Sequence, residues 1–140
     1  MFSAFDGEAI ARAEAAMSAM SDQFGDWLLD ELSRLEAANK VIYQSCAGQL
    51  EQDDFYRSAH DLKGLGTTYG YPIVSQFAGS LCKLLDDPQV KNHPADHIID
   101  AHVAAIVATV KQKVTSSDHP VGKALLIELQ GQVNKFAQAT

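Results

Sequence analysis

Residues 53 to 72 read DDFYRSAHDLKGLGTTYGYP, and this stretch decides the fold. Its apolar and small residues recur at spacings of three and four, which is the period of one face of an α-helix. These residues are Phe55, Ala59, Leu62, Gly66 and Tyr69. His60, Lys63 and Thr67 fall outside this stripe, so we expect them on the solvent side. Gly70 is placed to end the helix and Pro72 to begin the next one, because glycine is favoured just after a helix and proline in its first turn.

The rest of the chain predicts further helices around this one and leaves no credible strand. With the helix just described, the segments span about 6–20, 22–47, 53–70, 72–86, 94–114 and, after a polar connection, 119–137. Gly25 weakens the start of the second segment, so its boundary with the first stays open. Short connections favour antiparallel neighbours. We therefore expect an all-α fold, an antiparallel four-helix bundle with additional flanking helices and about six helices in total, in a single domain over residues 1–140.

The composition restricts the partners and the compartment. A net charge of −7 and an isoelectric point near 5.0 disfavour nucleic acid as a partner. The sequence has no apolar run near the roughly 20 residues that span a bilayer, and no basic region followed by an apolar core at its start. We therefore expect a cytoplasmic protein. Cys46 and Cys82 each stand alone in apolar helical patterns, which predicts buried free thiols.

His60 is the candidate for chemistry. On a helix, Lys63 and Gly64 share its face, three and four residues further on. The lysine supplies a cation that helps hold phosphate oxygens. Glycine costs about 1 kcal/mol relative to alanine inside a helix, and its missing side chain leaves space beside the imidazole for a phosphoryl group. Ordinary explanations also exist: a surface histidine, a solvated lysine and a glycine that allows close helix packing.

The order His-x-x-Lys-Gly at residues 60–64, followed by Gly70, resembles the histidine-containing phosphotransfer (HPt) domain family. The resemblance covers residues 53–85 with some specificity, and the helical pattern of the whole chain more loosely. It implies that His60 accepts phosphate from an aspartyl phosphate, that Lys63 stabilises the phosphoryl group and that Gly64 gives it steric clearance. Many members carry a glutamine 22 residues after the histidine, where this chain has Cys82, so the contribution of the next helix stays open.

This resemblance implies a phosphorelay intermediate that passes the phosphoryl group from one receiver domain to another. We expect a phosphocarrier and not an enzyme, because the catalytic site and its magnesium belong to the partner. The expected partners are receiver domains of response regulators or hybrid histidine kinases, docking near Arg57 and Thr67 on a monomer that binds no cofactor stably. The alternative is a helical adaptor or inhibitor that binds a kinase or receiver without being phosphorylated. The histidine-bearing domain of a chemotaxis-type kinase is a weaker interpretation, because the sequence shows no catalytic domain.

Other residues have simpler interpretations. Four histidines lack the spacing of a metal signature, and we expect surface or helix-cap positions for them. They are His93, His97, His102 and His119. The glycines between 64 and 70 do not match a dinucleotide-binding loop, since no strand precedes them. Met17 and Met20 are expected to fill the core, and Trp27 to pack in the core or at its edge.

Overall fold

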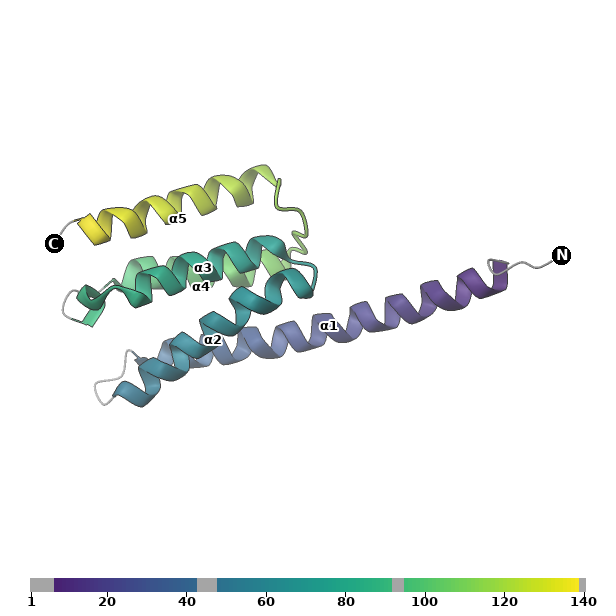
Figure 1. Cartoon of the computed structure of the whole chain (residues 1–140), viewed down its shortest axis with the longest axis horizontal. Coiled ribbons are helices and arrows are strands. Elements are labelled where there is room, and N and C mark those ends of the chain that lie inside the picture. The colour runs from purple at the N-terminus through teal and green to yellow at the C-terminus, as the bar shows by residue number, and fades with distance from the viewer. Residues whose placement is uncertain (1–6, 43–47, 92–94, 139–140) are drawn as a thin grey trace.

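The computed structural model describes residues 7–42, 48–91 and 95–138. These residues are mainly helical and contain no strand, which confirms the all-α prediction (Figure 1). The elements are α1 (Gly7–Ile42), α2 (Gln49–Thr68), α3 (Pro72–Asp86), a short 3-10 helix η1 (Pro88–Lys91), α4 (Asp96–Lys111) and α5 (Pro120–Gln138).

The helices pack around a single apolar core. α2 contacts α1 and α3, and α4 also contacts α1 and α3, so these four helices close a ring; α5 lies against α3 and α4. Each helix supplies large apolar side chains that are no more than 1% exposed, among them Leu35, Phe55, Phe77, Ile106 and Leu129. Burial of such side chains is the main force that holds the helices together.

The first two predicted helices form one continuous helix, which corrects the expected total of six. α1 runs for 36 residues straight through Gly25, so the described residues contain five α-helices and the short η1. A single glycine costs only about 1 kcal/mol in a helix, and the alanine-rich sequence before it favours helix strongly. Cys46, near the predicted end of the second segment, lies outside the described residues.

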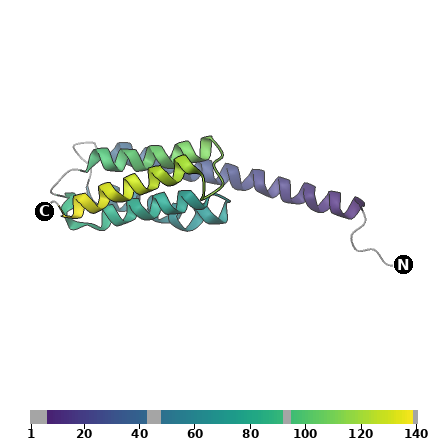
Figure 2. The same cartoon turned by 90° about the horizontal axis from the view of Figure 1, so that it is seen from above.

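α1 is longer than the bundle. Figures 1 and 2 show that its N-terminal half extends alone beyond the other helices. Between Gly7 and Met20 every residue except Ala9 is exposed. Met17 and Met20 are 70% and 53% exposed, so the prediction that they fill the core is wrong. Their helical stripe is real, but no helix of the bundle reaches far enough to cover it.

The ends of α2 have clear local causes. The helix begins at Gln49, earlier than predicted, because Gly48 acts as its N-cap and donates its backbone N–H to the Glu51 carboxylate at 2.8 Å. At the other end Gly70 adopts φ +89°, as expected for a terminating glycine. Its N–H donates to Thr67 O at 3.1 Å, and the N–H of Tyr71 donates to Gly66 O at 2.7 Å. This pair of bonds is the Schellman motif, which turns the chain sharply into α3.

The remaining helices follow the prediction closely. α3 has the predicted bounds. α4 ends at Lys111 rather than near residue 114, and Lys113 turns the chain with φ 55°. Its expected start at Pro94 lies outside the described residues. α5 begins at Pro120, and the backbone N–H of Gly122 donates to Nδ1 of His119 at 3.3 Å. Within the described residues no helix is both long and apolar enough to cross a membrane.

Candidate functional site

His60 lies in the middle of α2 on its solvent face. Ala59 and Leu62, which belong to the apolar stripe of α2, are fully buried. His60 lies between them in sequence but is exposed. The predicted stripe is therefore confirmed: the helix is held by its apolar face, and the imidazole is presented outward. An exposed group on an anchored helix can meet a partner without the helix having to move.

Lys63 leans from α2 toward α3. Its aliphatic stem crosses Gly79, where a Cβ would lie 3.8 Å from Lys63 Cε and 4.0 Å from Cδ. The aliphatic part of Lys63 thus packs over Gly79. A side chain larger than alanine at position 79 would compete with Lys63 for this space. Lys63 is exposed and forms no ion pair within 4 Å among the described residues, so its charge remains available to an incoming anion.

The two glycines on either side of Leu65 have different roles. A Cβ added at Gly64 would meet nothing within 4 Å, so helix packing does not require glycine there. A Cβ at Gly66 would lie 2.6 Å from Ser75 Oγ and 2.7 Å from the Ser75 backbone nitrogen. Gly66 is therefore the residue that lets α2 and α3 approach closely, and Gly64 leaves open space beside His60.

Tyr56, one turn before His60, completes the side of the site that faces α3, and sequence reasoning missed it. Its ring stacks on the imidazole with centroids 6.2 Å apart and an interplanar angle of 28°. A hydrogen bond to Asp86 of α3 raises the pKa of Tyr56, with smaller contributions from burial and nearby charge. Its position four residues before His60 on the same helix face was the signal available in the sequence.

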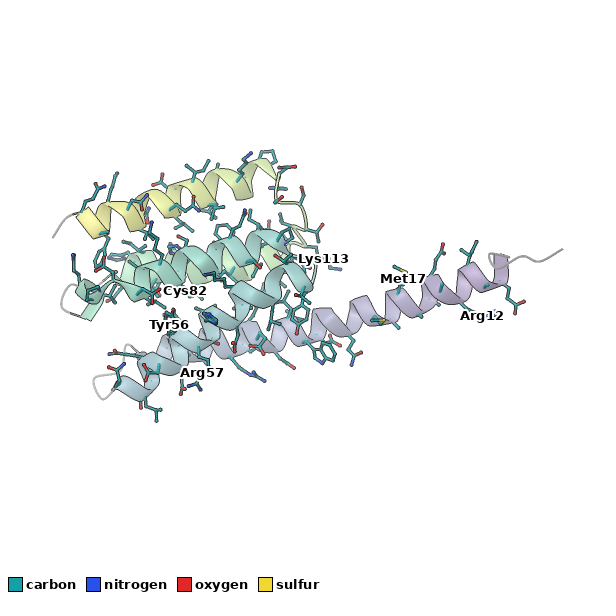
Figure 3. The ribbon with its side chains drawn as sticks, in the orientation of Figure 1. Arg12, Met17, Tyr56, Arg57, Cys82 and Lys113 are labelled. Carbon is teal, nitrogen blue, oxygen red and sulfur yellow. The ribbon has the colours of Figure 1, made fainter. Side chains whose placement is uncertain are left out.

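Cys82 occupies the α3 position at which many HPt domains carry a glutamine. Figure 3 shows it beside Tyr56, between α2 and α3. The residue is 3% exposed, and burial raises the pKa of its thiol to about 11 against the lowering effect of nearby Lys63. The thiol stays protonated near neutral pH, so it supplies neither an amide nor a charge to the surface.

The other polar residues of α3 flank the site without replacing that glutamine. Gln76 and Lys83 line a groove that runs from Lys63 toward α5. Lys83 Nζ donates to Asn134 Oδ1 of α5 at 3.1 Å, which directs this lysine away from α2. Gln76 is exposed, one helical turn before Gly79.

The two residues predicted to extend the docking surface are both tied to neighbours. Thr67 donates its backbone N–H to Ser75 Oγ at 2.8 Å, which links α2 to α3. Arg57 lies 3.8 Å from the Asp54 carboxylate, and both side chains are more than half exposed. Such a surface pair is weak, but it offsets part of the positive charge. The face around His60 therefore carries mixed charge, with Lys63 as its clearest cation.

The remaining histidines divide into three kinds. His119 caps α5 and His97 is exposed on α4, while His93 lies outside the described residues. His102 contradicts the surface prediction, because it is fully buried. Among the described residues no group of three or more histidine, cysteine, aspartate or glutamate side chains is arranged to hold a metal ion.

Comparison of the chain with protein-family models, curated proteins and solved structures gives no match. The site is therefore interpreted from its own chemistry. It combines the exposed imidazole of His60, the Lys63 cation packed over Gly79, the open space at Gly64 and the Tyr56 ring stacked on His60.

Proposed function

We propose that this protein is a histidine phosphocarrier of the HPt type, with His60 as the phosphoryl acceptor. The observation that carries the proposal is the open space at Gly64, directly beside an exposed imidazole and the unpaired Lys63. A glycine that packing does not require, inside a helix where it costs about 1 kcal/mol, is explained by a need for clearance at that point.

The proposed reaction is a phosphoryl exchange with an aspartyl phosphate of a receiver domain. A ring nitrogen of neutral His60 attacks phosphorus, the N–P bond forms as the bond from phosphorus to the carboxylate oxygen breaks, and the receiver aspartate leaves as a carboxylate. The imidazole then releases its N–H proton to water. Transfer of this kind depends on positioning and neutralisation of charge, which Tyr56 and Lys63 supply on this side; the magnesium is expected on the receiver.

The decisive experiment is incubation with a phosphorylated receiver domain, followed by intact mass measurement. We expect a gain of one phosphoryl group that is labile in acid and stable in base. His60→Gln should remove it, whereas His97→Gln, which changes an exposed histidine on α4, should leave it intact. Phosphate that persists in His60→Gln would contradict the assignment. Receiver binding without any phosphate would favour the adaptor alternative.

Lys63→Ala tests the electrostatic role. We expect transfer to slow about ten-fold or more, because a hydrogen bond to a charged group contributes roughly 1.5–3 kcal/mol. The fold should be unchanged, since the lysine is exposed. Lys111→Ala, at an exposed lysine of α4, is the matched control and should transfer at the wild-type rate. Equal rates in the two variants would show that Lys63 plays no part.

A further inference from the structure

The protruding half of α1 carries an apolar stripe that the bundle covers only in part. Ile10, Met17, Met20 and Trp27 are 43%, 70%, 53% and 43% exposed. The spacings between these four residues along the sequence are seven, three and seven. Ala13 and Phe24 stand within the two longer intervals, so the six positions are three or four residues apart. Spacings of three and four sustained over this length form a heptad pattern, which is typical of helices that pair along a seam.

This stripe continues the face of α1 that is buried further along. Ile10 and Met17 each precede a core residue, Leu28 and Leu35 respectively, by 18 residues, which is five complete turns at 3.6 residues per turn. Leu28 and Leu35 are fully buried. The side of the helix that packs on α2 and α4 in the bundle therefore extends past the end of the bundle, where those helices no longer accompany it.

We propose that a second copy of this chain covers the stripe, so that the protruding halves of two α1 helices pair antiparallel. The seam consists of the six stripe positions 10, 13, 17, 20, 24 and 27. These positions pair with one another when the two helices run in opposite directions. When Met17 faces Met20 of the other copy, Ile10 faces Trp27. The large Trp27 thus meets the smaller Ile10 at each end, as tight packing of a seam requires.

The flanks of the seam favour the same pairing. One side carries Ala9, Ala16 and Gln23, and the other carries Glu14. In the antiparallel arrangement the Glu14 residues of the two copies lie about two helical turns apart along the pair, so these like charges do not meet. The small Ala9 and Ala16 also allow the two helices to approach closely.

The length of the protruding segment also fits a pair of copies. The protruding segment from Gly7 to Trp27 is about 30 Å long at 1.5 Å per residue, and in this register Ile10 of each copy lies beside Trp27 of the other, at the point where the other bundle begins. Trp27 marks that point, with its ring centroid 6.4 Å from that of Tyr69 at the end of α2. The four large apolar residues of the stripe are 43–70% exposed in one copy, so pairing removes apolar surface from water along the whole segment.

The association state of the full chain tests this proposal. Sedimentation equilibrium should give twice the 15.2 kDa chain mass. The double variant Met17→Glu, Met20→Glu should weaken association by about 100-fold or more, because two carboxylates per copy enter the seam. The control Ala15→Glu, Ser18→Glu adds the same charge to the opposite face and should remain dimeric. A monomeric wild type at high micromolar concentration, or a double variant that stays dimeric, overturns the proposal.

The direction of pairing has its own test. In a background without Cys46 and Cys82, one sample carries Met17→Cys and a second carries Met20→Cys. After mixing and oxidation, the cross-link between positions 17 and 20 should dominate. Dominant 17–17 and 20–20 cross-links would indicate parallel helices and overturn the antiparallel arrangement. None of these variants alters His60 or Lys63, so phosphoryl transfer is measured independently of association.

Discussion

His60 and His102 show how little a residue's type says about its role. Both lie within helices and have charged residues nearby in sequence, but one is exposed and the other is fully buried. Nδ1 of His102 lies 2.7 Å from Ile98 O, and Nε2 lies 2.8 Å from Ser80 Oγ. A carbonyl oxygen only accepts, so Nδ1 donates and the Ser80 hydroxyl donates to Nε2. His102 is a neutral link between α4 and α3, whereas the exposed His60 stacks on Tyr56 and makes no such link.

The burial of His102 predicts a loss of stability on mild acidification. Burial lowers its pKa in the folded protein, so the unfolded chain takes up a proton first as the pH falls below about 6.5. The contribution of His102 is fully present above that pH and decreases below it, by up to about 1.4 kcal/mol per pH unit.

Urea unfolding at pH 7 and pH 5.5 measures this effect. His102→Leu should lower stability at pH 7, because Ser80 loses its partner, but should show a smaller difference between the two pH values than the wild type. His97→Gln, which removes an exposed histidine, should keep the wild-type difference. Equal pH dependence in wild type and His102→Leu would show that this imidazole is not the group responsible.

At the scale of the elements, the contact between α2 and α3 positions the site. Gly66 lets the two helices approach closely, and the Thr67 N–H donates to Ser75 Oγ across the contact. The aliphatic part of Lys63 packs over Gly79 of α3. The Tyr56 hydroxyl bonds to Asp86 at the far end of the same contact. The orientation of the residues around His60 therefore depends on how closely α2 approaches α3.

Two alanine substitutions, two residues apart, test this interpretation. Gly66→Ala should destabilise the fold by about 1–3 kcal/mol, because its Cβ overlaps the Ser75 backbone and forces the helices apart. Gly64→Ala should stabilise it by up to about 1 kcal/mol, because its Cβ meets only open space and alanine is the better helix former. Chemical denaturation measures both, and equal effects would contradict the different roles assigned to the two glycines.

Gly64→Leu should keep the helix, because leucine is a better helix former than glycine. It should block phosphoryl transfer, because its side chain fills the open space beside His60.

At the scale of the whole molecule, the protein consists of a packed bundle and a long helix that extends from it. The bundle holds the core and the His60 site, while the first half of α1 contributes no buried residue between Gly7 and Met20. Helices of this length are marginal in water without a partner. Alanine-rich sequence and continuity with the bundled half of α1 favour the helix here, and pairing with a second copy would stabilise it further.

Removal of residues 1–22 should therefore leave the bundle folded, with near-native helicity in its remaining part. The thermal midpoint of the full chain should rise with protein concentration, since dimerisation stabilises the folded state by mass action. The midpoint of the shortened chain should not depend on concentration. Calorimetry over a hundred-fold range compares the two, and an unfolded shortened chain would contradict the view that this segment lies outside the core.

The sequence by itself determined which segments are helical and which face of each is apolar. The period of Phe55, Ala59 and Leu62 placed His60 on the solvent side, and Pro72 marked the start of α3 correctly, because these features depend on local backbone geometry. The tertiary structure alone decided what covers each face. It left Met17 exposed and buried His102, since periodicity identifies an apolar face without naming the helix that meets it. It also distinguished Gly66 from Gly64, because a close approach between two helices is a distance across the fold that spacing along one chain does not contain.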